Sequence, residues 1–235
     1  MDINRIPFYQ YNTIIVGTGA AGLNAAVTLH KLGQKNIALI TEGRYMGTSR
    51  NTGSDKQTYY KMTQCGSEPD SVRKMAETLF DGGCVDGDIA MAEAAGSLRA
   101  FYHLVDIGVP FPFNKSGEYV GYKTDHDPLK RGISAGPLTS KYITECLERQ
   151  AEERGIPFFD GYQAVRLLTE EKNGEKWAAG IIALNKRKAA SADERYAVFS
   201  AVNIIWATGG EAGMYQASVY TVSQTGGMGI LLEAG

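Results

Sequence analysis

The feature that most constrains the fold is a glycine-rich turn near the N-terminus, placed between a strand and a helix. Residues 13–16 (TIIV) form a continuous apolar, β-branched run, which is typical of a strand buried on both faces of a parallel sheet. The turn at 17–22 (GTGAAG) follows at once and leads into an alanine- and leucine-rich helix, expected over 20–32. A second apolar run at 36–40 completes a βαβ unit, which we assign to residues 12–42.

The spacing inside this unit indicates a dinucleotide-binding site. Gly17 allows the tight turn, Gly19 lets the backbone approach a pyrophosphate, and Gly22 lets the helix pack closely against the strand. The helix that begins at Ala20 directs its free N–H groups and the positive end of its dipole towards the phosphates. Glu42 follows the second strand, 42 − 22 = 20 residues after the last glycine, where a carboxylate can bind the hydroxyls of a ribose. The alternative is an ordinary glycine turn of an α/β protein, which the position of the acid disfavours.

Glycine is the outlier in an otherwise ordinary globular composition. The chain has 28 glycines among 235 residues, about 12% where about 7% is usual. They occur in doublets and short clusters, a pattern that indicates tight turns and close approaches of the backbone to a ligand. The 24 lysines and arginines nearly balance the 26 aspartates and glutamates. The sequence therefore predicts no bulk attraction to nucleic acid or to an anionic membrane.

Neither a secretory signal nor an apolar stretch long enough to span a bilayer is expected. The three cysteines, Cys65, Cys84 and Cys146, have neither CxxC nor histidine spacing. They favour a reduced, cytoplasmic setting over a disulfide framework or a metal site. The acidic cluster at 86–88 (DGD) lacks the ligand pattern of a calcium loop, so no metal site is predicted.

Beyond residue 42 the chain departs from a simple alternation of strands and helices. A long polar loop is expected at 43–60, followed by a helical segment at 67–108. The second helix of that segment is predicted to begin at a cap, Asp88. Its predicted buried face is Ala95, Leu98, Tyr102 and Val105. A hairpin is then expected at 111–123 and a helix at 139–154.

Three strand-like segments predict a β-meander over 162–201, with a turn at 173–174 (NG). The three strands are expected at 162–170, 177–185 and 195–201. A buried strand at 203–206 then returns to the main sheet. The expected fold class is therefore α/β, a Rossmann-like domain with a parallel sheet, helices and a three-stranded β-meander.

The order of these motifs resembles the FAD-binding part of the fumarate reductase/succinate dehydrogenase flavoprotein family, which also includes L-aspartate oxidase. The matching segments are GTGAAGLNAA at 17–26, EG at 42–43, GTSRNTGS at 47–54, LERQAEERGIPFFDG at 147–161, the meander, ATGG at 207–210 and TGGMG at 225–229. The resemblance runs over nearly the whole chain, so residues 1–235 are expected to form one FAD-binding domain. An NAD-dependent dehydrogenase is a weaker alternative, because its sheet typically continues in alternating strands and helices.

The resemblance implies a set of cofactor-binding residues. Those at the pyrophosphate and the adenosine ribose are Gly17, Gly19, Ala20, Gly22, Glu42 and Gly43. Those beside the flavin are Thr48, Gly53 and Ser54, while Ala164 contacts the adenine through its backbone. Those that let the chain pass close to the cofactor are Ala207, Thr208, Gly209 and Gly210.

The sequence also departs from the family pattern at three positions. Gly47 stands where the succinate dehydrogenase branch has the histidine that bonds the flavin, so FAD is expected to be non-covalent. Ser54 replaces one glycine of a Gly-Gly pair, and Gly227 stands where the family has a carboxylate. Family members continue well past residue 235. The capping domain, with its substrate-binding arginines and histidines, is therefore expected to be absent, and no catalytic residue is assigned.

Four further residues are of interest. His30 and His103 lie on expected helices and are interpreted as ordinary helix-face residues. His126 lies in a polar loop beside aspartates, and a solvated loop is preferred to a role in a site. Arg131 lies where the family often has an arginine near the flavin, and a surface arginine is an equal alternative.

The function that the resemblance implies is that of a flavin-dependent oxidoreductase. Its substrate would be a small dicarboxylate or α,β-unsaturated acid, and its partner an electron donor or a subunit that completes the site. The alternative is a non-catalytic FAD-binding fragment or subunit that requires a partner chain.

Overall fold

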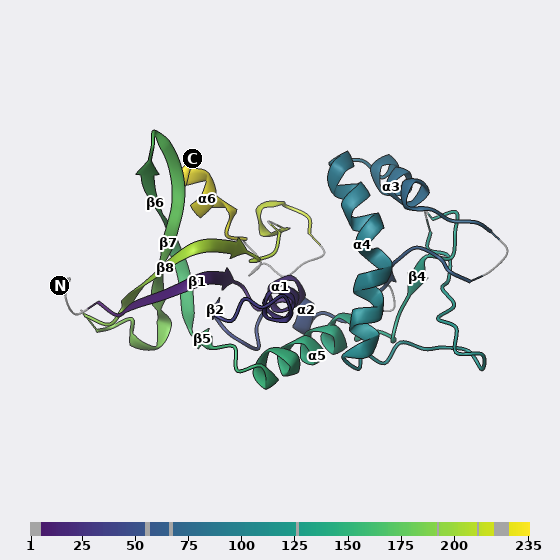
Figure 1. Ribbon diagram of the computed structural model, residues 1–235, viewed down its shortest axis with the longest axis horizontal. Coiled ribbons are helices and arrows are strands. Elements are labelled where there is room, and N and C mark those ends of the chain that lie inside the picture. Colours follow the sequence, from purple (N-terminus) through teal and green to yellow (C-terminus); the bar gives the residue numbers. More distant parts are fainter. Residues whose placement is uncertain are drawn as a thin grey trace. The chain divides into compact units, whose positions relative to one another are not determined.

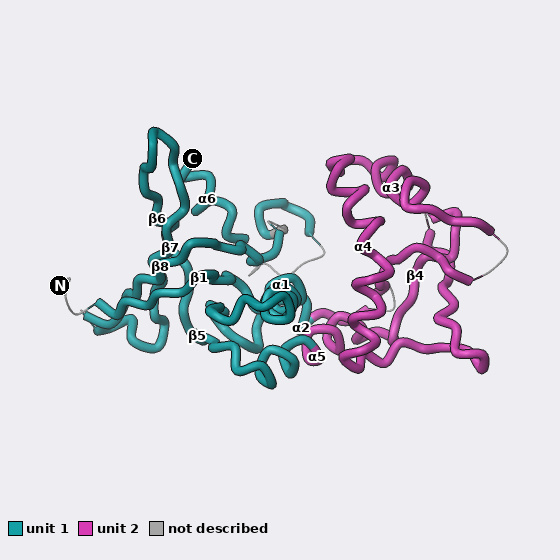
Figure 2. Tube along the Cα trace, viewed as in Figure 1, with its two compact units in different colours: residues 1–51, 147–235 teal, residues 52–146 magenta. Residues whose placement is uncertain are grey.

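The computed structural model describes residues 6–54, 57–65, 68–125, 127–191, 193–210, 212–218 and 226–235. The chain divides into two compact units (Figure 2). Residues 1–51 and 147–235 form the first, here named the sheet unit, and residues 52–146 form the second, the helical unit. His126 and Thr225 lie outside the described residues.

The sheet unit is built on one six-stranded sheet with the order β5-β2-β1-β8-β7-β6 (Figure 1). Its strands are β1 (Phe8–Val16), β2 (Ile37–Thr41), β5 (Phe158–Asp160), β6 (Tyr162–Lys172), β7 (Glu175–Asn185) and β8 (Tyr196–Trp206). The first four in the spatial order pair in parallel, and β8, β7 and β6 pair antiparallel. This mixed sheet with its helices confirms the α/β class and places the glycine turn at the carboxyl ends of parallel strands.

The central parallel strands are buried on both faces. Ile14 and Ile15 on β1, and Leu39 and Ile40 on β2, have no exposed surface. Because successive side chains of a strand point to opposite faces, both faces of the sheet are covered here. That is why the sequence shows continuous apolar runs at these strands, not an alternation of apolar and polar residues.

Helix α1 (Ala20–Lys31) follows the glycine turn, within the predicted bounds. At its end Gly33 adopts a φ of 99°. The N–H groups of Gly33 and Gln34 donate to the carbonyl groups of His30 and Leu29, at 3.2 and 3.0 Å. This pair of bonds requires a left-handed residue, which glycine adopts without strain.

The third strand of the meander and the strand that returns to the sheet are one strand, β8. One edge of β8 pairs antiparallel with β7 over residues 196–200, and its other edge pairs in parallel with β1 over residues 198–206. The expectation of separate strands at 195–201 and 203–206 is therefore wrong. Asn203 resembles a turn residue in the sequence, but it pairs with Thr13 of β1 and its amide donates to Oδ1 of Asn12 at 3.3 Å.

The helical unit contains α3 (Val72–Asp81), α4 (Gly87–Asp106) and a short antiparallel pair, β3 (Tyr59–Tyr60) with β4 (Gly132–Ile133). α5 (Thr139–Glu153) belongs to this unit up to Cys146 and to the sheet unit from Leu147. The sheet unit also holds α2 (Thr48–Asn51), α6 (Met228–Ala234) and two 3-10 turns, η2 (Lys186–Lys188) and η3 (Ala212–Met214). Over the described ranges, no helix combines the length and the apolar character that a membrane crossing needs.

Helix α4 buries a different face from the predicted one. The buried residues are Ala90, Ala94, Ser97, Phe101 and Leu104, whereas Ala95 and Tyr102 of the predicted face are exposed. The two faces are one residue apart and both are spaced for a helix, so periodicity alone does not choose between them. The choice follows the Phe101 ring, whose centroid lies 4.9 Å from that of Phe111.

The predicted cap of α4 and the predicted hairpin are also corrected. The N-cap is Asp86, not Asp88, because the Asp86 carboxylate accepts the N–H groups of Asp88 and Ile89, both at 3.0 Å. Residues 111–123, all described, contain a turn but no strand ladder. The Asn114 side chain accepts the N–H groups of Ser116 and Glu118, both at 2.9 Å. This local bonding uses backbone donors that a hairpin would need.

Candidate cofactor-binding site

The glycine turn after β1 is enclosed by the ends of two neighbouring strands. Gly17 donates its N–H to Ile40 at 2.8 Å, and Ala207 donates its N–H to Val16 at 2.8 Å. Gly17 has a φ of 110°, and a Cβ there would lie 2.3 Å from the carbonyl oxygen of Ala207. Only glycine fits this position, for both steric and conformational reasons.

Gly22 brings helix α1 against the turn. A Cβ on Gly22 would lie 2.0 Å from the carbonyl oxygen of Gly17 and 3.4 Å from Cβ of Ala207. The helix therefore packs directly on backbone at the carboxyl ends of β1 and β8. This close approach supports the role predicted for Gly22.

The N-terminus of α1 has no side chain of its own as a cap. Gly19 is the N-cap residue, and no side-chain cap bond is made there. The first-turn N–H groups, starting at Ala20, are the donors that a helix leaves for an external acceptor. Ser49 Oγ lies 3.3 Å from the position that a Cβ on Gly19 would take. Ser49 is not among the predicted site residues, because only the fold brings the loop after β2 to this helix.

Glu42 lies beside the turn, but its carboxylate is engaged. Thr18 Oγ1 donates to Thr41 Oγ1 at 3.0 Å, which joins the turn to the end of β2. The next residue, Glu42, accepts a bond from Lys186 Nζ at 2.6 Å, and both side chains are half-exposed. An exposed pair of this kind contributes little to stability. Gly43 lies under Met46, whose Sδ would be 2.4 Å from a Cβ there.

The loop after Gly43 leads to Thr48, the first residue of α2. Gly47 has a φ of 96°, and its carbonyl oxygen accepts the N–H of Asn51 at 3.2 Å and Nδ2 of Asn51 at 3.0 Å. Gly53 and Ser54 belong to the helical unit, where Ser54 donates its N–H to Pro137 at 3.0 Å. The structure thus groups Thr48 with the glycine turn in the sheet unit, and it describes Gly53 and Ser54 in the other unit.

The end of β8 and the segment after it carry two buried polar atoms that have no hydrogen-bond partner within the described part of the chain. They are Nε1 of Trp206 and Oγ1 of Thr208. Both lie 2.9 Å from the position of a Cβ on Gly227, so a larger residue at 227 would displace them. Ala207 packs on the turn as described, and Gly209 has a φ of 83°, while Gly210 follows in an exposed position. Unpartnered polar atoms at this edge of the sheet fit a site that binds a polar ligand. Trp206 is a second residue of this site that is not among the predicted site residues.

Ala164 lies at an irregularity in β6. It pairs with Ala183 of β7, and the register shifts before Arg166. A bulge leaves the extra residue, Val165, without its regular ladder bonds. Ala164 itself is paired in the ladder, so the backbone contact predicted for it stays a prediction.

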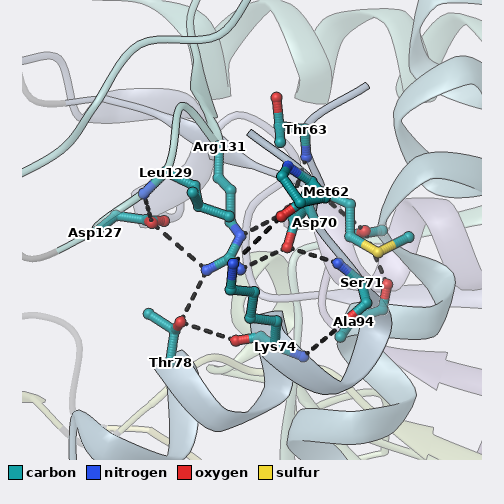
Figure 3. A network of polar contacts seen from close by, with 12 residues as sticks. Met62, Thr63, Asp70, Ser71, Lys74, Thr78, Ala94, Asp127, Leu129 and Arg131 are labelled. Carbon is teal, nitrogen blue, oxygen red and sulfur yellow. Dashed lines mark hydrogen bonds and ion pairs between the residues drawn. The ribbon is translucent and has the colours of Figure 1, made fainter. Parts of the chain in front are cut away.

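Arg131 serves the helical unit itself. Its guanidinium is fully buried and binds Asp70 with two bonds, Nε to Oδ2 at 2.9 Å and Nη2 to Oδ1 at 2.7 Å (Figure 3). Nη1 donates to Tyr60, Thr78 and Asp127, at 3.1, 2.9 and 3.4 Å. Burial alone would raise the pKa of Asp70, but the bonds from Arg131 and two backbone N–H groups hold that pKa below its usual value. These contacts give Arg131 a structural role within the unit.

Comparison with known proteins agrees with this geometry. Residues 12–233 match the family described as FAD binding domain. L-aspartate oxidase of Agrobacterium fabrum is 27% identical over 228 residues, which cover 94% of this chain and 40% of that protein. The succinate dehydrogenase flavoprotein subunit of Coxiella burnetii is 24% identical over 253 residues, covering 99% of this chain and 40% of that protein.

A solved structure has the same fold. Sdh1 of Mycobacterium smegmatis, in complex with UQ1, superposes with a TM-score of 0.82 at 19% identity, covering 98% of this chain and 39% of that chain. The chain spans about 40% of the length of the curated relatives it matches. The family match favours FAD over the NAD alternative. Because that match extends over residues 12–233, the chain belongs to the FAD binding domain family, and FAD is its cofactor.

Proposed function

We propose that this chain is the FAD-binding part of an oxidoreductase that acts on a dicarboxylate or an α,β-unsaturated acid. The observation that carries the proposal is the enclosed glycine turn, with the cap-free N-terminus of α1 behind it. The substrate class is supported by the names of relatives, which include L-aspartate oxidase, succinate dehydrogenase and 8-methylmenaquinol:fumarate reductase flavoprotein subunits. Aspartate, succinate and fumarate are all four-carbon dicarboxylates.

Different residues of the sheet unit bind different parts of FAD. Gly19 and Ala20 bind the pyrophosphate through backbone N–H groups, and Glu42 binds the adenosine ribose. Ala164 offers its backbone to the adenine. The loop that contains Thr48 lies on the flavin side, and Gly47 provides no side chain for a covalent bond, so binding is non-covalent.

When bound, FAD supplies hydride exchange with the substrate. The chain's own contribution is to exclude water and to orient the cofactor at the carboxyl ends of the strands. The chain spans about 40% of the length of its relatives, so we place the substrate-binding groups and the proton donor in a further polypeptide segment or a completing subunit.

A non-catalytic FAD-binding subunit is the second candidate, and this partial coverage favours it. The three cysteines form no disulfide among the described residues, and this supports the cytoplasmic location that we propose.

The direct test is an FAD titration of the purified protein. We expect visible flavin absorbance, uptake of about one FAD per chain, and release of the flavin into the supernatant when the protein is precipitated with acid. NAD at the same concentration should not compete. A colourless protein that takes up no FAD would contradict the proposal, and flavin that stays with the precipitate would contradict non-covalent binding.

A further inference from the structure

A single carboxylate holds both ends of the loop that faces the glycine turn. Glu148 lies on α5, in the part that belongs to the sheet unit. Its Oε1 accepts a bond from Arg44 Nε at 2.6 Å, and its Oε2 accepts one from Arg50 Nη2. The exposed fractions of the three side chains are only 10% for Glu148, 19% for Arg44 and 11% for Arg50. These pairs are therefore poorly screened by solvent, unlike an ordinary surface ion pair.

Arg44 is fixed from several other directions. Its guanidinium carbon lies 4.1 Å from the ring centroid of Phe158, and its Nη2 also pairs with Glu152. Its backbone N–H donates to Oδ1 of Asp160 at 2.8 Å. Arg44 is therefore tied to β5 and to α5, and Glu148 extends that connection to Arg50, six residues further along the chain.

The residues between the two arginines are those that face the cofactor site. Thr48 begins α2, and Ser49 Oγ is the side-chain atom nearest the N-cap position of α1. Loss of the shared carboxylate would leave two guanidinium groups of the same charge close together. Their repulsion would favour a loop that moves away from α5, and with it Thr48 and Ser49.

We propose that Glu148 is a positioning residue for the cofactor, which holds the loop between Arg44 and Arg50 at the N-terminus of α1. The inference rests on the proposed function, because it assigns this loop to the flavin side of FAD. Glu148 touches neither the glycine turn nor the end of β2 in any described contact. The adenosine diphosphate half of the ligand is bound by backbone N–H groups of the glycine turn and α1, which stay in place when the loop moves, so we expect it to bind independently of Glu148.

The test compares two glutamates of the same helix, E148Q and the control E153Q. Glu153 is exposed and pairs only with Arg149 and Gln150 of its own helix among the described contacts. Dissociation constants are measured for FAD and for ADP. For E148Q we expect FAD to bind about tenfold more weakly, equivalent to about 1.4 kcal/mol, while ADP binds within twofold of the unmodified protein. E153Q should bind both ligands normally.

Trypsin gives a second readout that needs no cofactor. Cleavage after Arg44 and Arg50 should be slow in the unmodified protein and in E153Q, and faster in E148Q. Unchanged FAD affinity and unchanged cleavage in E148Q would overturn the inference. An equal loss of FAD and ADP binding, with a fall in thermal stability, would overturn it as well, because that is a general folding role. Failure of the unmodified protein to bind FAD would instead contradict the proposed function.

Discussion

Arg131 illustrates how a buried charged side chain determines its own surroundings. A guanidinium in the interior needs partners for its donors, and here Asp70, Tyr60, Thr78 and Asp127 provide them. In the sequence these partners are up to 71 residues away, as the Tyr60 bond shows. An arginine in a polar loop therefore looks equally suited to a ligand, to solvent or to a core network, and only the fold decides.

Removal of the carboxylate from this network should be costly. Asp70→Asn leaves Arg131 buried without its ion-pair partner, and we expect the free energy of unfolding to fall by about 3–5 kcal/mol. The control is Glu77→Gln, which breaks an exposed pair with Arg73 and should cost less than about 0.5 kcal/mol. Urea unfolding curves measure both. A loss for Asp70→Asn as small as for the control would show that the network contributes little.

At the scale of elements, the sequence alone predicts a turn correctly wherever the backbone there accepts only one or two residue types. The turn between β6 and β7 has positive φ at both Asn173 and Gly174, 55° and 81°, and this dipeptide predicts such a turn. Gly17 is required by its positive φ and by a backbone neighbour, and Gly22 by a backbone neighbour alone. The βαβ unit could therefore be predicted to within a few residues.

Where two arrangements of an element fit the same pattern of apolar residues, the sequence alone does not predict which one forms. The face of α4 and the continuity of β8 depend on packing against segments distant in the chain, such as Phe111 and Asn12. Ser49 and Glu148 were missed for the same reason. Their relation to the glycine turn exists only once β2, α1 and α5 are assembled.

Alanine substitutions at two helical glycines should change the stability in opposite directions. In Gly22→Ala the new Cβ meets the backbone oxygen of Gly17. We expect a loss of about 1–3 kcal/mol together with weaker FAD binding. Gly96→Ala in α4 meets nothing within 4 Å and should gain up to about 1 kcal/mol, because alanine favours the helix. Thermal unfolding and FAD titration measure both variants. Equal effects would contradict the close packing.

At the scale of the whole molecule, burial of tyrosines makes stability depend on alkaline pH. Burial raises the pKa of Tyr59 and of Tyr60 to about 12, and it also raises the pKa of Tyr11 and Tyr162. The unfolded chain has tyrosines that ionise near pH 10. Stability is therefore retained below about pH 10 and falls as the pH rises towards 12, because the unfolded state loses its protons first.

Unfolding free energies measured between pH 9 and pH 12 should show this fall, alongside the absorbance of tyrosinate. Tyr59→Phe should make the fall less steep, because it removes one of the hydroxyl groups whose pKa is raised. The substitution disturbs few contacts, since this hydroxyl makes only one described bond, to Ser97 at 3.3 Å. A stability that is constant over this range would contradict the assignment.

One strand, β8, belongs both to the antiparallel hairpin and to the parallel sheet. Across β7 it is in register with β6, where Ala164 lies, and at its far end it passes directly into Ala207. The distance between Ala164 and Ala207 along the strand direction is therefore set by the number of residues in this continuous ladder, at about 3.3 Å for each residue. The FAD that we propose to reach from one place to the other would meet a distance set by hydrogen-bonded backbone, which neither a side-chain substitution nor a rotamer change alters.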